Sequence, residues 1–128
     1  MGKGEIIMKK QLIIKKCNHC GGMVEVIKDC KIKCCDEEMV TLVPNTVEAA
    51  IEKHIPTYEK TTEGIFIRVN HVMEKEHYIE WIALVTDNKE YKVTLYPEQN
   101  AECEFPYVPG STLYAYCNKH GLWKQTVE

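Results

Sequence analysis

The stretch Tyr78–Tyr96 reads YIEWIALVTDNKEYKVTLY and decides the fold class. Its two parts, Tyr78–Thr86 and Tyr91–Tyr96, are rich in β-branched and aromatic residues, which favour strands. The intervening segment Asp87–Glu90 consists mainly of residue types common in turns. The stretch therefore predicts a β-hairpin.

Further short strand patterns lie on both sides of this hairpin. Gly64–Asn70 alternates apolar and polar residues, and Glu102–Tyr107 and Thr112–Cys117 are separated by Pro and Gly. Several short strands without intervening helices predict a small antiparallel β-sandwich whose last strand ends by Gly121. Upstream of them, Val43–Thr46 predicts a connector and Glu48–Ala50 a turn of helix.

The first third of the chain predicts a separate, cysteine-rich domain. Predicted strands Gln11–Lys16 and Met23–Lys28 flank Cys17–Gly22, whose glycines permit a tight metal-binding turn. A unit this small needs a metal or disulfides, because below about 40 residues hydrophobic burial alone is rarely sufficient. We expect residues 1–42 to form this metal-binding domain with its lead-in, and residues 43–128 to form the β-sandwich.

Composition limits the classes of function. The 128-residue chain has a formal net charge of -3, which argues against a nucleic-acid partner bound mainly through phosphates. The apolar run Leu12–Ile14 is too short to span a membrane, and no signal peptide is recognised, so we expect a cytoplasmic protein without a membrane partner. The seven cysteines are an odd number and include adjacent ones, which favours metal binding over disulfides.

Four cysteines of the first third are candidate ligands of one metal: Cys17, Cys20, Cys34 and Cys35. Four thiolates suit tetrahedral zinc or a single iron, and ligand type does not separate the two. Because Cys34 and Cys35 are neighbours, binding of both to one ion requires a distorted local backbone. We expect Cys30 to be a small buried or idle thiol, and His19 to face solvent.

Four of the five histidines and one cysteine form a second candidate set: His54, His71, His77, His120 and Cys117. Each is expected at a strand end or in a loop, where the loops of a sandwich cluster. Structural zinc sites close at four ligands, whereas five protein ligands on octahedral iron leave one position open for a small molecule. Taken singly, each histidine is more often a surface or hydrogen-bonded residue.

A family resemblance gives these residues a more specific interpretation. The segments Glu52–Pro56, His71–Ile82 and Tyr116–Trp123 resemble superoxide reductase. With the cysteine pattern in front of them, the chain resembles the two-iron form, desulfoferrodoxin, from about Lys16 to Lys124. The resemblance implies a desulforedoxin-like metal-binding domain followed by an immunoglobulin-like antiparallel sandwich, in a homodimer.

The resemblance also implies the ligand sets and the activity. The four histidines would be equatorial ligands of a non-haem iron and Cys117 its axial ligand, while the four early cysteines would bind a rubredoxin-like iron. The implied reaction is the one-electron reduction of superoxide to hydrogen peroxide, with re-reduction by a rubredoxin-like donor.

Three further roles follow for residues beside the iron. Fe(II) and one thiolate sum to a local charge of +1 (2 minus 1), and Lys53 adds a positive charge that attracts the superoxide anion. The Cys117 thiolate donates electron density, tuned by N–H groups of Lys119 and His120. Glu52 would occupy the open position once the iron is ferric.

Two other functions remain open from the residues. The first is a metal-stabilised electron-transfer or binding module in which zinc fills the cysteine site and the histidines are incidental. The second is dismutation of superoxide, which would also release oxygen.

Overall fold

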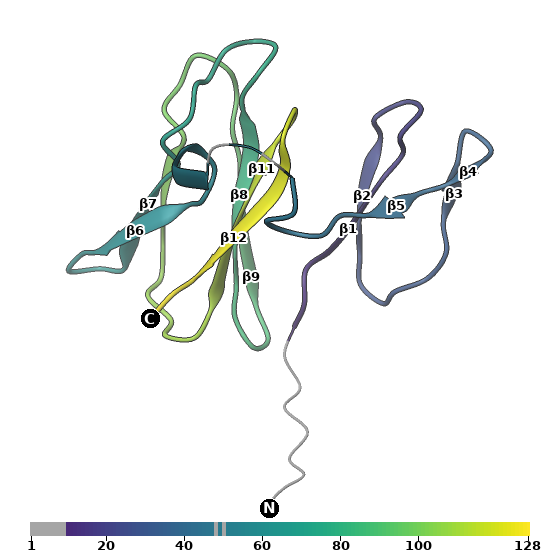
Figure 1. The fold of residues 1–128 in the computed structure, drawn as a ribbon. Helices are drawn as coiled ribbons and strands as arrows, with labels where there is room; N and C mark the ends of the chain where they lie inside the picture. Colours follow the sequence, from purple (N-terminus) through teal and green to yellow (C-terminus); the bar gives the residue numbers. More distant parts are fainter. Residues whose placement is uncertain (1–9, 48, 50) are drawn as a thin grey trace, which may run out of the picture.

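The computed structural model describes residues 10–47, 49 and 51–128, and nearly all of its regular elements are β-strands (Figure 1). The predicted mainly β, antiparallel fold is confirmed. One short 3-10 turn, η1, spans Ile51–Lys53. The helical turn expected at Glu48–Ala50 stays a prediction, because Glu48 and Ala50 lie outside the described residues.

Two antiparallel sheets form the β-sandwich. The first has the order β10-β7-β6, with β6 at Thr57–Lys60, β7 at Ile65–Arg68 and β10 at Glu102–Phe105. The second has the order β12-β11-β8-β9, with β8 at Ile79–Val85, β9 at Glu90–Thr94, β11 at Thr112–Cys117 and β12 at Gly121–Thr126. Apolar side chains from both sheets form the core between them, including Ile65, Ile67, Ile82, Leu84, Leu113 and Ala115.

The predicted hairpin is confirmed as β8 and β9, which pair antiparallel from Trp81 to Val85. Glu90 belongs to the strand and not to the turn, because it pairs with Val85. The turn is closed by the Thr86 amide, which donates to the Lys89 carbonyl at 2.9 Å. The residues of β8 are buried except for half-buried Glu80, which explains why this strand is mostly apolar.

The expectation that the last strand ends by Gly121 is wrong, because β12 begins there. Gly121 has a φ of +82°, a conformation that glycine adopts without steric cost. It therefore reverses the chain after Cys117, and the following residues pair along the whole of β11. Strand β6 was likewise not delimited from the sequence, since Thr57–Lys60 is mostly exposed and lacks an apolar pattern.

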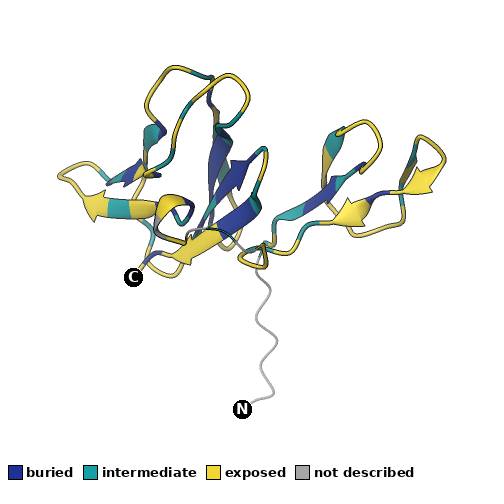
Figure 2. Ribbon diagram, turned by 45° about the horizontal axis from the view of Figure 1, so that its top comes forward, coloured by how far each residue is buried: buried dark blue, intermediate teal, exposed yellow. Residues whose placement is uncertain are grey.

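The cysteine-rich unit, described here from residue 10 to residue 42, has its own small sheets. A three-stranded sheet has the order β2-β1-β5, with β1 at Ile13–Lys16, β2 at Met23–Val26 and β5 at Val40–Thr41. A two-stranded hairpin joins β3 at Lys33–Cys34 to β4 at Glu37–Glu38. Figure 2 shows burial concentrated in β1 and in the sandwich, whereas this hairpin is mostly exposed.

The cysteine-rich unit packs on the outer face of the four-stranded sheet. Ile14 is 1% exposed and contributes to a cluster with Trp81, Tyr116 and Leu122. Burial of an isoleucine side chain stabilises by about 1.5–3 kcal/mol. The outer face of β8 is therefore covered, which explains why this strand is buried on both sides.

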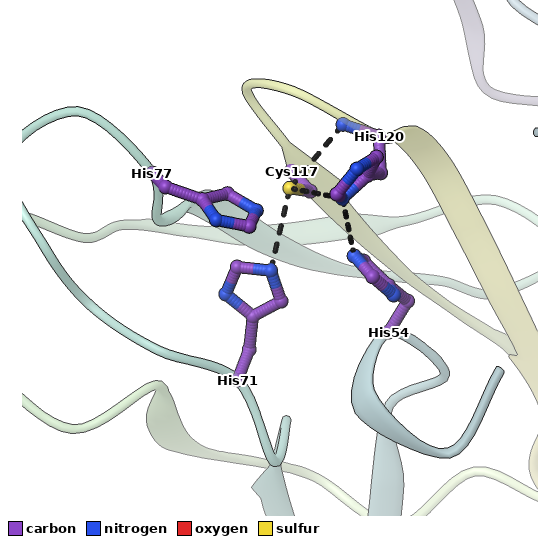
Figure 3. Close-up of side chains that lie close together, drawn as sticks. All are labelled: His54, His71, His77, Cys117 and His120. Carbon is purple, nitrogen blue, oxygen red and sulfur yellow. Dashed lines mark hydrogen bonds between the residues drawn. The ribbon is translucent and has the colours of Figure 1, made fainter. Parts of the chain in front are cut away.

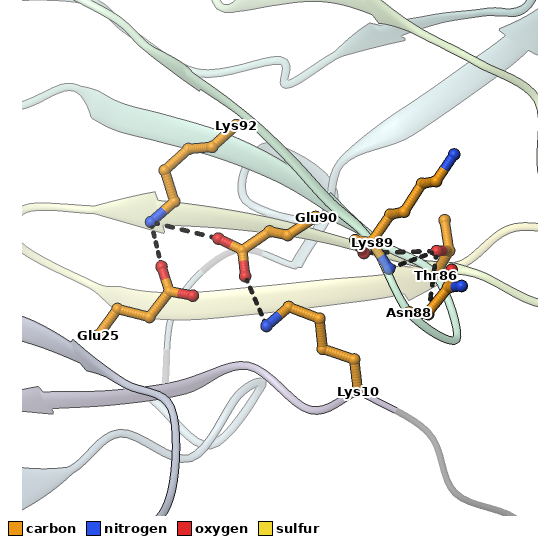
Figure 4. A network of polar contacts seen from close by, with 7 residues as sticks. All are labelled: Lys10, Glu25, Thr86, Asn88, Lys89, Glu90 and Lys92. Atoms are coloured by element: carbon orange, nitrogen blue, oxygen red, sulfur yellow. Dashed lines mark hydrogen bonds and ion pairs between the residues drawn. The ribbon is translucent and has the colours of Figure 1, made fainter.

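Charged side chains join the same two parts of the chain (Figure 4). The Lys92 ammonium lies 2.7 Å from Glu25 and 3.8 Å from Glu90, and Lys10 lies 3.6 Å from Glu90. Lys92 also lies 4.7 Å from the ring centroid of Trp81. Such partly exposed pairs each contribute about 0.2–1 kcal/mol, so they add orientation to the apolar contact.

No helix among residues 10–47, 49 and 51–128 is long and apolar enough to cross a membrane.

Candidate metal centres

Five side chains from loops and strand ends meet at one end of the sandwich (Figure 3). The group consists of His54, His71, His77, His120 and Cys117, whose ligand atoms all lie within 4.8 Å of one another. His54 directly follows η1, and His71 and His77 lie in the loop between β7 and β8. Cys117 ends β11, and His120 lies in the turn to β12.

The four imidazoles form a closed ring in which each lies beside two others. The centroid separations and interplanar angles are 4.8 Å and 67° for His54–His71, 4.6 Å and 90° for His71–His77, 5.0 Å and 76° for His77–His120, and 4.9 Å and 88° for His120–His54. Neighbouring rings are thus steeply inclined, and one nitrogen of each lies within 4.8 Å of one nitrogen of every other ring. His54 Nε2 and His120 Nδ1 approach to 3.0 Å.

The Cys117 sulfur lies on one side of this ring. Its Sγ is 3.4 Å from His71 Nε2 and 3.9 Å from His120 Nδ1. A cavity of about 500 Å³ is lined by the four histidines together with Ala49, Lys53, Val72 and Glu74, but not by Cys117. The cavity therefore reaches the four imidazoles but not the sulfur, and it leaves room for a small molecule beside the histidines.

Two of the four imidazoles, those of His71 and His77, favour the neutral form that a metal ligand requires. Burial is the main cause that lowers the pKa of His71 and of His77, so both rings are neutral at pH 7. His71 Nδ1 bonds to the Val72 carbonyl, which directs Nε2 toward the sulfur. The buried His77 Nε2 has no hydrogen-bond partner among the residues described. An orphaned nitrogen at this position fits a metal ligand.

Cys117 is fully buried, and burial raises the pKa of its thiol. The predicted amide contact from His120 is present, with its N–H donating to Sγ at 3.4 Å. The amides of Lys119 and His120 both act to lower the pKa of Cys117. Since burial disfavours an isolated thiolate, a bound cation is the natural source of its stabilisation.

Asn118, which the sequence did not single out, connects the two loops that carry the ligands. Its Oδ1 accepts from the Tyr78 amide at 3.0 Å, and its Nδ2 donates to the Glu76 carbonyl at 3.0 Å. These bonds hold the turn after Cys117 against the segment around His77. The sequence feature that could have identified Asn118 is its position between Cys117 and His120 in the ligand motif.

Trp123 contacts two of the histidines, His54 and His120. Its indole N–H donates to the His120 carbonyl at 3.0 Å, and its ring stacks on His54 at 4.9 Å with an interplanar angle of 24°. The indole is 2% exposed, so it is held in place by the core.

The other four sequence-selected cysteines also come together. Cys17, Cys20, Cys34 and Cys35 form a group whose sulfurs lie within 4.8 Å of one another. Cys20 Sγ is 3.7 Å from Cys34 Sγ, which is 3.9 Å from Cys35 Sγ. The distorted backbone expected at the adjacent pair is confirmed, because Cys35 has a φ of 53° and Asp36 of 62°.

A glycine-containing turn shapes the first half of this group. Gly21 has a φ of +79°, and its amide donates to the Cys17 carbonyl at 2.9 Å. The Cys20 amide donates to Cys17 Sγ at 3.4 Å and the Gly22 amide to Cys20 Sγ at 3.3 Å. The Cys20 amide is the main cause that lowers the pKa of Cys17 to about 6, whereas contact with the Cys20 sulfur raises that of Cys34 to about 12. Four close sulfurs do not all ionise without a cation among them.

Four other residues considered from the sequence have different placements. Cys30 and His19 are exposed, and among the described residues neither belongs to a metal-ligand group. Cys30 is thus an idle thiol and not a buried one, while the expectation for His19 is confirmed. Lys53 is exposed and lines the cavity. The side chain of Glu52 lies outside the described part.

Comparisons with known proteins agree on one family. The family model described as Desulfoferrodoxin matches residues 46–126. The desulfoferrodoxin of Syntrophotalea carbinolica is 42% identical over 122 residues, covering 91% of this chain and 97% of the relative. That of Nitratidesulfovibrio vulgaris is 42% identical over 123 residues, covering 91% and 98%. The superoxide reductase structure from Treponema pallidum has a TM-score of 0.72 at 23% identity, covering 91% and 98%, which shows a shared fold.

Proposed function

The chain belongs to the desulfoferrodoxin family, and we propose that it is a superoxide reductase that converts superoxide to hydrogen peroxide. One observation carries the proposal: four imidazoles and a buried sulfur come together, and an open cavity reaches the imidazoles but not the sulfur. This arrangement provides five donors and one free approach, as a small substrate requires.

The ligand set suits iron. The five side chains His54, His71, His77, His120 and Cys117 would hold it, because imidazole and thiolate together fit a redox-active transition metal. Iron bound there supplies the single electron that superoxide takes up, together with two protons, to become hydrogen peroxide. The remaining steps depend on residues of the chain.

The protein's own residues prepare the site for an anion. Burial lowers the pKa of His71 and His77 and so favours the neutral form of these two rings. The His120 amide holds Cys117 in place and limits its electron donation. Lys53 brings a positive charge to the cavity and attracts superoxide. The open cavity admits water, which supplies the protons.

Replacement of Lys53 by isoleucine is expected to slow the encounter with superoxide. Loss of one positive charge at the cavity should lower the second-order rate constant about 3- to 10-fold at low salt, and less at high salt. Pulse radiolysis measures this constant. Lys89→Ile on the β8–β9 turn is the matched control and should leave it unchanged. Equal constants for Lys53→Ile and the unmutated protein would argue against steering.

Glu52 precedes Lys53 in η1, and we propose that its carboxylate occupies the open position in the oxidised protein. Glu52→Ala should therefore react with superoxide at an unchanged first rate, because the carboxylate is absent from the reduced site. The absorption spectrum of the oxidised protein should change. An identical oxidised spectrum in the variant would contradict this role.

We propose iron for the four-cysteine group as well, where it stabilises the cysteine-rich unit and accepts electrons. Cys20 and Cys35 are exposed, which gives an external donor access to this group. The family resemblance supports a rubredoxin-like donor and a homodimer, while the cytoplasmic location stays a prediction from the sequence. The resemblance also supports a domain boundary after Leu42, where the cysteine-rich unit meets the sandwich.

Rapid mixing of the fully reduced, metal-analysed protein with superoxide tests the function. We expect one hydrogen peroxide per superoxide, one electron consumed from the protein, and no oxygen. Release of oxygen would show dismutation instead. A protein that contains zinc and leaves superoxide unreacted would show a metal-stabilised binding module.

A further inference from the structure

The cavity beside the imidazole ring carries two side chains of opposite charge. Lys53 and Glu74 both line it, together with the four histidines, Ala49 and Val72. Their formal charges cancel (+1 and −1), so Glu74 offsets part of the attraction that Lys53 exerts on an anion. Glu74 therefore opposes the steering that Lys53 provides.

The backbone fixes Glu74 close to a metal ligand. Its amide donates to the His77 carbonyl at 3.0 Å, and the His77 amide donates to the Glu74 carbonyl at 3.1 Å. This reciprocal pair closes the loop between β7 and β8, so Glu74 and His77 move together. Burial is the main cause that lowers the pKa of His77, and the Glu74 charge acts in the opposite direction. The carboxylate is thus within electrostatic range of that ring.

A negative charge at this place has a selective effect. An anion that rests against the ring feels the repulsion of Glu74 most strongly, whereas an anion still approaching through solvent is screened from it. Superoxide is consumed as soon as it is reduced, so a short stay suffices for it. A chemically inert anion is not consumed, so the fraction of sites that it occupies depends only on its dissociation constant. Repulsion by Glu74 raises that constant and lowers the occupancy.

We propose that Glu74 is a specificity-determining residue that keeps inert anions from occupying the cavity beside the four histidines. The inference rests on the proposed function, because it assigns Glu74 a role at the same site. This role would explain why a negatively charged side chain lies beside a cavity that receives an anionic substrate.

Azide binding to the oxidised, iron-loaded protein tests the proposal without superoxide. Glu74→Gln preserves the size of the side chain and removes its charge. We expect the Kd for azide, followed by absorption, to fall about two- to fivefold at low salt and to approach the unmutated value at high salt. Glu76→Gln is the matched control: it lies in the same loop but does not line the cavity, and its Kd should not change.

The double variant Lys53→Met/Glu74→Gln separates charge from shape. If the two charges oppose each other, the double variant should return to within about twofold of the unmutated Kd, because its wall again carries no net charge. With superoxide, the second-order rate constant of Glu74→Gln should rise by a smaller factor than the azide Kd falls, and azide should inhibit this variant at a lower concentration.

An unchanged or higher azide Kd in Glu74→Gln would overturn the proposal. A changed spectrum of this variant before azide is added would also overturn it, since Glu74 would then be an iron ligand. If the unmutated protein binds azide but does not reduce superoxide, the proposed function fails while the test of Glu74 still stands.

Discussion

Cys117→Ser is expected to abolish superoxide reduction, with a loss of rate on the order of 100-fold or more. Loss of a residue that only hydrogen-bonds to a metal ligand already costs about 10- to 100-fold, and Cys117 would be a ligand itself. The serine oxygen would be a neutral, weakly donating group in place of a thiolate. Iron should still bind through the imidazoles, but the absorption band that arises from sulfur should disappear. Metal analysis, the visible spectrum and pulse radiolysis together measure these effects.

Cys103→Ser is the matched control for this substitution. Cys103 is a half-buried thiol that packs against the same core as Cys117 but lies outside the ligand group. Burial of a hydroxyl in either place costs about 1–3 kcal/mol of stability. Both variants should therefore lower the free energy of unfolding, and only Cys117→Ser should lose the sulfur band. Retention of that band in Cys117→Ser would refute the assignment of Cys117 as a ligand.

Cys34→Ser is expected to remove one metal per chain and to unfold the cysteine-rich unit while the sandwich remains folded. The unit buries few side chains, chiefly Ile14, Cys17, Val26 and Met39. So small a core depends on its metal, because the free energy of metal binding is also free energy of folding. Metal analysis and hydrogen exchange of residues 11–41 measure the loss.

Cys30→Ser provides the comparison, since Cys30 is exposed and outside both ligand groups. It should retain both metals and full protection from exchange. Cys34→Ser should also keep a rate constant with superoxide within about twofold of the unmutated value if the two centres react independently. Undiminished protection of residues 11–41 in Cys34→Ser would show that the unit folds without its metal.

Local sequence patterns predicted the strands whose buried faces are clear. β8 and β11 follow from runs of β-branched and aromatic residues, because such residues suit a buried, pleated surface. The same residue types predicted β9, although none of its residues is fully buried. β6 was not delimited, since its residues are mostly exposed and carry no apolar alternation. β12 was missed because Gly121 indicated the end of the last strand, whereas its positive φ produces a reversal into another strand.

The sequence by itself determined which residues are able to bind metals, because thiols and imidazoles carry that chemistry wherever the chain places them. It also determined the distorted backbone at Cys35, since adjacent ligands impose it locally. Only the tertiary structure decided that His54 and His120, 66 residues apart, approach to 3.0 Å. That contact depends on how η1 and the β11–β12 turn are held together by the core and by Trp123. The same long-range packing brought Glu74 to the cavity, and no local pattern contains that information.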